Sequence, residues 1–152
     1  MLSYPGNVPV ALQDLGRAVK QLQYRHHRGM DRKLREVGTS LAQWDALRAI
    51  ATRPNSSAHA LAEMTFQTDQ SFGALANRLQ KGGMIERVAG PGRAIRHRLT
   101  PRGEATLRKG HEVVGPVLES SLAPLTSRQR EDFYRLIRRA LVEGTPPQRV
   151  GL

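Results

Sequence analysis

The chain has 152 residues, which is enough for one domain with a buried core. Its formal charge of +11 predicts a polyanionic partner, and the absence of cysteine excludes disulfides, thiolate zinc sites and thiol-based redox sensing. No apolar run is long enough to span a bilayer and no signal-peptide core is visible, so we expect a soluble cytoplasmic protein with no membrane partner.

A long first helix is predicted from about Val10 to Val37. Its apolar residues recur at helical spacing, and Gly38 follows as a C-cap. These apolar residues are Leu12, Leu15, Val19, Leu22, Met30 and Val37.

A second helix is predicted directly after it. Ser40 and Gln43 form a capping-box pattern that starts this helix, and Pro54 ends it. One side of the helix is apolar and consists of Leu41, Trp44, Leu47 and Ile50.

Two further helices are predicted on either side of a tight turn. The first is short, from Ser57 to about Met64, and residues 65–67 form the turn. Thr68 can cap the next helix, which the Gly-Gly pair at 82–83 stops. The apolar face of this fourth helix consists of Phe72, Leu75, Ala76 and Leu79.

A basic hairpin is predicted after the fourth helix. Residues 84–89 and 94–99 read as strands, and Gly-Pro-Gly at 90–92 reads as their turn. Residues 84–109 carry seven Lys or Arg against two acidic residues. A helix, a turn, a recognition helix and a basic hairpin, in this order, predict a winged helix-turn-helix that binds double-stranded DNA.

Two helices are predicted after the hairpin. Thr100 and Pro101 start a fifth helix that runs towards Leu122, in which Pro116 is expected to cause a kink or a break. A second capping box, at Thr126, opens the last helix. The predicted order is α-α-α-α-β-β-α-α, a mainly α fold of the α+β winged-helix type.

The whole chain, 1–152, is interpreted as a single domain. Residues 40–103 form the predicted DNA-binding lobe, and residues 8–37 and 104–143 contribute dimerisation helices whose apolar stripes need a partner surface. The residues expected in the homodimer interface are Leu12, Leu15, Leu122, Phe133, Leu136, Ile137 and Leu141. A dimer would present two recognition helices about one DNA turn apart.

Several segments carry a family resemblance. They are Trp-Asp-Ala-Leu at 44–47, Leu-Ala-Glu at 61–63, the run from Asn77 to Arg87, and Leu-Thr-Pro-Arg-Gly at 99–103. On these segments the chain resembles the MarR family of bacterial transcription regulators over nearly its whole length. The resemblance implies a homodimer, a palindromic operator and often a small-molecule effector that alters DNA affinity.

The chain departs from the family at several positions near the recognition helix. Phe66 stands in the turn where many members have Gly, which predicts a different backbone geometry there. Gly73 and Ala74 stand where members often present Thr and Arg, and Asp69 stands where a basic residue is frequent. The basic hairpin, which is the wing of the winged helix-turn-helix, also lacks the usual Asp two residues before Arg93.

The predicted DNA contacts on the fourth helix are its outward-facing residues. They are Gln70, Ser71, Ala74, Asn77 and Arg78. Gln70 can pair with adenine, Ser71 can contact base edges or phosphate, and Ala74 can pack on a thymine methyl group. Asp69 would repel phosphate, but it can cap the helix or accept a hydrogen bond from cytosine. The alternative for this face is a solvated surface.

The predicted DNA contacts in the hairpin are arginines. Arg93 at the tip suits a narrow minor groove, whose negative potential attracts a guanidinium. Arg96 and Arg98 alternate with less polar residues and are either phosphate contacts or solvated charges. Arg87 closes the first strand and could support the same surface.

An effector pocket is implied only by the resemblance, which places it between the first, second and fifth helices. Tyr24, His27 and Trp44 could line it, and the alternative is that Trp44 is a core residue. The five histidines share no ligand spacing, so we expect no metal and no cofactor, and His26 is interpreted as a core or interface residue.

The sequence thus predicts a DNA-binding transcription regulator, a ligand-responsive repressor that binds as a homodimer. No catalytic constellation is present, so an enzyme is not expected. The alternative is a winged-helix interaction module, or a nonspecific architectural DNA-binding protein, in which base reading has been lost.

Overall fold

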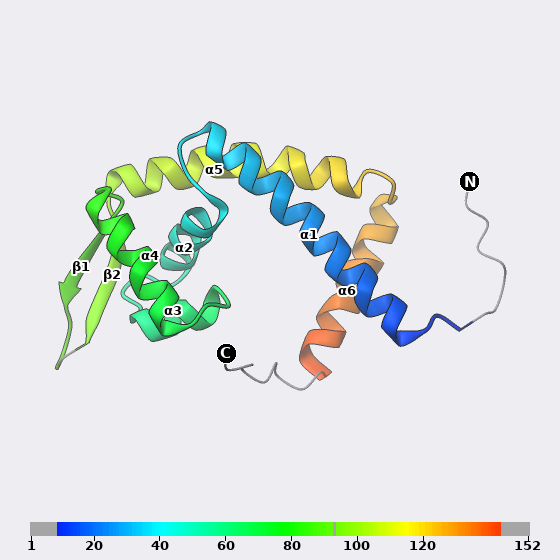
Figure 1. Cartoon of the computed structure of the whole chain (residues 1–152), viewed down its shortest axis with the longest axis horizontal. Coiled ribbons are helices and arrows are strands. Elements are labelled where there is room, and N and C mark those ends of the chain that lie inside the picture. Colours follow the sequence, from blue (N-terminus) through cyan, green and yellow to red (C-terminus); the bar gives the residue numbers. More distant parts are fainter. Residues whose placement is uncertain (1–8, 93, 144–152) are drawn as a thin grey trace. The chain divides into compact units, whose positions relative to one another are not determined.

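The computed structural model describes residues 9–92 and 94–143. The elements are α1 (Leu12–Glu36), α2 (Leu41–Thr52), α3 (Ala58–Met64), α4 (Asp69–Lys81), β1 (Ile85–Ala89), β2 (Ile95–Leu99), α5 (Pro101–Leu122) and α6 (Ser127–Glu143) (Figure 1). This order confirms the predicted mainly α winged helix-turn-helix. The chain divides into two compact units after Val117, within α5, and each unit is described separately.

Side-chain caps set the starts of α2, α3, α4 and α5 in the first unit. The Thr68 hydroxyl accepts from the Ser71 amide at 3.1 Å, and the Ser40 hydroxyl accepts from the Gln43 amide at 3.2 Å. Ser57 and Thr100 cap α3 and α5 in the same way. These caps explain why the helix boundaries follow from sequence, because each cap involves residues three positions apart.

The core of the first unit lies under the helix-turn-helix. Its buried residues are Ala46, Leu47, Ala49, Ile50, Leu61, Ala62, Phe72, Leu75, Ala76, Leu79 and Ile85, contributed by α2, α3, α4 and β1. Burying a side chain of the size of Phe72 or Leu79 stabilises the fold by about 1.5–3 kcal/mol. The apolar face predicted for the fourth helix is therefore the face that fixes α4 in the lobe.

The hairpin of β1 and β2 is antiparallel, with Ile85 opposite Leu99 and Arg87 opposite His97. The loop between α2 and α3 extends this sheet. The Asn55 amide donates to the His97 carbonyl at 3.1 Å, and the His97 amide donates to the Ser56 carbonyl at 3.2 Å. The wing is thus attached to the helical core by backbone hydrogen bonds at His97, in the middle of β2.

The turn between α3 and α4 differs from what the sequence indicates. Phe66 has a φ of +56°, the left-handed conformation that glycine adopts most easily, and its side chain is 93% exposed. The prediction of a different backbone geometry, based on the replacement of Gly, is therefore wrong. The hydrogen bonds around the turn, such as Gln67 amide to Ala62 carbonyl at 2.9 Å, hold Phe66 in this conformation.

The helix α5 is continuous across Pro116, so the expected break does not occur. Contacts at the start of α5 explain why the sequence there is Thr-Pro-Arg-Gly. The Thr100 hydroxyl donates to the Gly83 carbonyl at 2.6 Å, and Gly103 packs directly on the Met84 backbone, where any Cβ would collide with the Met84 carbonyl. These contacts fix the first turn of α5 against the residues that precede β1.

In the second unit, Thr126 and Gln129 form the predicted capping box. The Thr126 amide donates to the Gln129 side chain at 2.9 Å, and the Gln129 amide donates to the Thr126 hydroxyl at 3.2 Å. The helix α6 that follows exposes large apolar side chains, namely Tyr134, Leu136, Ile137, Leu141 and Val142.

Candidate nucleic-acid interface

The outward face of α4 is polar and open to solvent. All the residues predicted there are exposed: Gln70, Ser71, Ala74, Asn77 and Arg78. Asp69 lies in the first turn of the helix, and Arg78 and Lys81 lie in the last turn. The negative charge is thus near the N-terminus of the helix and the positive charges are near its C-terminus, where each interacts favourably with the helix dipole.

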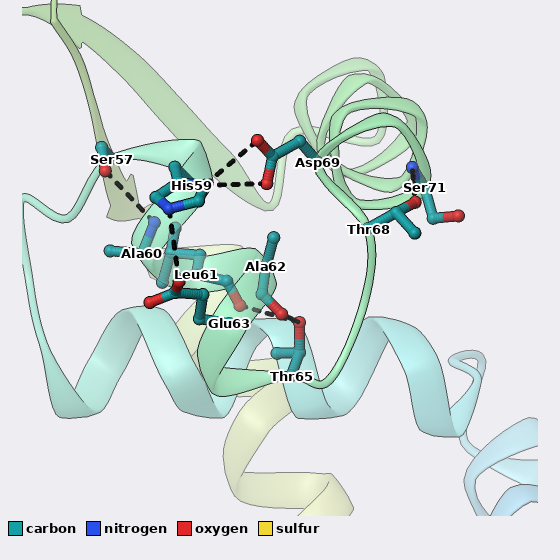
Figure 2. A network of polar contacts seen from close by, with 10 residues as sticks. All are labelled: Ser57, His59, Ala60, Leu61, Ala62, Glu63, Thr65, Thr68, Asp69 and Ser71. Carbon is teal, nitrogen blue, oxygen red and sulfur yellow. Dashed lines mark hydrogen bonds and ion pairs between the residues drawn. The ribbon is translucent and has the colours of Figure 1, made fainter. Parts of the chain in front are cut away.

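The Asp69 carboxylate is bound by a histidine of the preceding helix (Figure 2). His59 Nδ1 lies 3.0 and 3.1 Å from the two oxygens of Asp69, and His59 Nε2 lies 3.3 Å from Glu63 Oε1. The cap of α4 is Thr68 and not Asp69. Sequence reasoning missed His59, because a separation of 10 residues reveals a contact only once the turn geometry is known.

Two of the predicted DNA contacts bind each other. Arg87 Nη1 in β1 donates to Asn77 Oδ1 in α4 at 2.8 Å, which links the wing to the recognition helix. Arg87 Nε is buried and has no hydrogen-bond partner among the described residues. Because arginine only donates, Asn77 must direct its oxygen towards Arg87, and its NH₂ group remains available to an acceptor.

The other wing arginines bind the loop between α2 and α3. Arg96 Nη1 donates to the Asn55 carbonyl at 2.9 Å, and Arg98 Nε donates to Asn55 Oδ1 at 2.5 Å. Asn55 has a φ of +67°, which asparagine tolerates better than most residues. Each guanidinium has five N–H donors, so both arginines keep donors for a phosphate. Arg93 lies outside the described residues.

A buried histidine connects the wing to α4. His97 is 2% exposed, its Nδ1 lies 2.9 Å from the Ser56 carbonyl, and its ring packs edge-on against Phe72 with 6.1 Å between ring centroids. Burial lowers the pKa of His97, and the nearby charge of Arg87 lowers it further, against the opposing effect of the Ser56 hydrogen bond. The neutral imidazole is therefore the form that fits the folded lobe.

The residues predicted to line an effector pocket occupy two different environments. Trp44 is 3% exposed, its Nε1 donates to the Leu107 carbonyl at 3.2 Å, and its ring meets the His111 ring edge-on. Tyr24 and His27 are exposed and border a hollow along α1 that Trp44 does not line. The structure thus brings Tyr24 and His27 together and places Trp44 in the core between α2 and α5.

The hollow along α1 is basic. Arg25, Arg28 and Arg32 border it beside Tyr24, and the Arg28 guanidinium lies 5.6 Å from the centroid of the Tyr24 ring. His26 on the same helix is half-buried, and its pKa is lowered by burial and by the charge of Arg25.

Across residues 9–92 and 94–143, no group of three or more His, Cys, Asp or Glu is arranged to hold a metal ion. None of the helices in that same part of the chain is both long and apolar enough to cross a membrane.

A helix with an exposed polar face, held after a tight turn and linked to a basic hairpin, defines a winged helix-turn-helix protein of the DNA-binding class. Comparison with known proteins agrees. The MarR family pattern matches residues 37–94. The HTH-type transcriptional repressor Rv2887 of Mycobacterium tuberculosis is 29% identical over 106 residues, which cover 68% of this chain and 76% of the relative.

Solved structures are similar over most of the chain. Rv2887 of Mycobacterium tuberculosis in complex with p-aminosalicylic acid has a TM-score of 0.70 and 26% identity, covering 82% of this chain and 96% of that one. A cysteine-to-serine variant of MarR from E. coli complexed with operator DNA has a TM-score of 0.78 and 21% identity, covering 84% and 94%. This chain is therefore similar to MarR family transcription regulators in fold and, over residues 37–94, in sequence pattern.

Proposed function

We propose that this protein is a cytoplasmic, sequence-specific repressor that binds a palindromic DNA operator as a homodimer and is not an enzyme. One observation carries the proposal: the buried face of α4 fixes the helix in the lobe, while Gln70, Ser71 and Ala74 face solvent together. The relative Rv2887 is named a transcriptional repressor, and a similar MarR structure contains operator DNA.

The contacts of the wing support the same function. Arg87 couples β1 to α4, and Asn55 anchors Arg96 and Arg98. A wing that is fixed before binding loses little conformational freedom when it contacts DNA. We infer that α4 enters the major groove, that Arg93 enters the minor groove, and that Arg96 and Arg98 contact phosphates.

Homodimerisation is supported by apolar side chains that are exposed in the single chain. On α1 these include Leu12 and Leu15, and on α6 they include Leu136, Ile137 and Leu141. Sedimentation of the wild type should give a dimer, and Leu136→Glu should shift it towards the monomer. Arg128→Gln removes one positive charge from the same helix and should leave the dimer intact.

The small-molecule effector is proposed to be an aromatic carboxylate bound at the hollow along α1. Tyr24 and His27 offer ring contacts, and Arg25, Arg28 and Arg32 offer charge. Rv2887 has been solved with salicylic acid and with p-aminosalicylic acid. Release of the operator requires that the effector bind the DNA-free conformation of the protein more tightly than the DNA-bound conformation. Salicylate should therefore weaken operator binding by the wild type and not by Arg28→Gln.

Selection from random double-stranded DNA tests the function directly. A defined palindrome is expected, and its affinity should exceed that of scrambled DNA by at least about a thousandfold. A flat preference would instead identify a nonspecific architectural protein, and no DNA binding would identify an interaction module.

A further inference from the structure

The first turn of α4 carries a negative charge where the proposed function brings phosphates close. Asp69 is the first residue of α4, and its side chain is 62% exposed. A carboxylate without a partner at this place would repel the DNA backbone. Asp69 therefore either weakens DNA binding or has a separate role in it.

His59 holds the Asp69 carboxylate in one orientation (Figure 2). Its Nδ1 contacts both Asp69 oxygens, at 3.0 and 3.1 Å, and its Nε2 side faces Glu63. His59 belongs to α3 and Asp69 to α4, so the contact crosses the helix-turn-helix turn. A hydrogen bond from a neighbouring helix restricts the rotamers of Asp69 before DNA arrives, which lowers the entropy lost on binding.

We propose that Asp69 reads a cytosine of the operator and that His59 is the residue that positions it. This inference rests on the proposed function and adds a specificity determinant to it. A carboxylate accepts a hydrogen bond from the cytosine N4 amino group in the major groove, where residues at the start of a recognition helix meet base edges. Each carboxylate oxygen has two acceptor sites, so the contact with His59 leaves acceptors free for the base.

The surroundings of Asp69 leave room for this contact. Gly73 lies one turn further along α4, and a Cβ built there has no neighbouring atom within 4 Å. Ala74 beside it is also small. The start of α4 can therefore approach the base edges closely, which a short side chain such as Asp69 requires.

Random-DNA selection with the full-length wild type and Asp69→Ala tests the reading role. The wild-type operator should contain one cytosine in each half-site whose preference is lost in Asp69→Ala. Replacing that base pair should weaken wild-type binding about 5- to 150-fold and leave binding by Asp69→Ala nearly unchanged. Asp69→Asn keeps the shape and should move the preference at this position towards adenine. Glu86→Ala removes the same charge from the wing and should leave every preference unchanged.

The positioning role is tested at the same base pair. His59→Ala should reduce the discrimination against a replaced cytosine, whereas His59→Asn, whose amide can donate from near the Nδ1 position, should restore part of it. Thermal unfolding of each variant separates this effect from a loss of folded protein. Full discrimination in His59→Ala would overturn the positioning role.

The outcomes separate the inference from the function on which it rests. An equal change in affinity for all sequences in Asp69→Ala would assign the residue to helix stability or phosphate repulsion and overturn the inference. A wild-type motif without a cytosine at any position that responds to Asp69 would overturn it as well, and leave the repressor function standing. A wild type that selects no motif would overturn both.

Discussion

His97 is the residue at which the folded wing depends most directly on protonation. Its ring is buried against Phe72, and its Nδ1 hydrogen-bonds the Ser56 carbonyl. Burial and the charge of Arg87 place its folded-state pKa below the ordinary value of 6.5, which the unfolded chain retains. Below pH 6.5 the unfolded state therefore binds more protons than the folded state.

The free energy of unfolding should fall as the pH decreases from 6.5 towards the lowered folded-state pKa of His97. Urea unfolding of the wild type and His97→Gln across this range measures the effect. The variant is expected to be less stable at neutral pH and to show a shallower pH dependence. His26→Gln is the matched comparison, because burial also lowers the pKa of His26, on α1. An equally steep dependence in His97→Gln would assign the titration to other groups.

Phe66 stores strain in the turn that places α4. A left-handed conformation costs a residue other than glycine about 1–2 kcal/mol, whereas glycine itself adds about 0.5–1 kcal/mol of chain entropy. Its side chain is 93% exposed, so packing offsets little of the strain. Phe66→Gly should therefore raise the free energy of unfolding by about 0.5–1 kcal/mol.

Chemical denaturation checks this, with Phe66→Ala as the control. Alanine keeps the Cβ and with it the strained φ, so this variant should stay within about 0.5 kcal/mol of the wild type. Equal effects of the two substitutions would show that the aromatic ring, and not the backbone, determines stability at this position.

At the scale of elements, the close packing of α5 on α2 depends on a glycine. A Cβ at Gly110 would collide with the ring of Trp44, which is buried and hydrogen-bonded to the Leu107 carbonyl. A rigid indole held by that bond has little freedom to move away. The position of Trp44 in the core thus follows from a contact between two helices that are far apart in sequence.

Gly110→Ala should lower the free energy of unfolding by about 1–3 kcal/mol, although alanine is the better helix former by about 1 kcal/mol. Gly73→Ala is the control within α4, where a Cβ meets no atom within 4 Å. That variant should gain up to about 1 kcal/mol from helix propensity alone. Thermal unfolding should therefore move in opposite directions for the two variants, and a gain in both would contradict the packing at Trp44.

What the sequence predicts well is local in the chain. The helix starts after Ser40 and Thr68 follow from caps in which the capping side chain accepts from an amide three positions later. The buried face of α4 follows from its 3.6-residue period. The contacts that complete the candidate site join distant segments, such as Asn55 with Arg98 and His59 with Asp69. Such pairs leave no periodic signal, so only the folded chain reveals them.

The positive charge of the whole molecule sets how its DNA affinity should respond to salt. A net charge of +11 supports binding to any duplex, but only charges that touch phosphates release counterions. Arg98 illustrates the difference, because its Nε is already bound to Asn55 while its other donors are free for a phosphate. The geometry alone is compatible with a purely structural clamp, and the salt dependence distinguishes the two roles.

Arg98→Gln removes the charge and keeps a side-chain donor for Asn55. If Arg98 contacts a phosphate in each subunit of a dimer, the slope of log K against log salt should become shallower by about 2, since each phosphate contact contributes about 1. Fluorescence anisotropy with the operator and with scrambled DNA measures it, and the change should be the same for both duplexes. Gln80→Ala, an uncharged change at an exposed position of α4, should leave the slope as it is. An unchanged slope in Arg98→Gln would restrict Arg98 to holding the loop of Asn55, and the phosphate contacts of the wing would then have to come from other arginines.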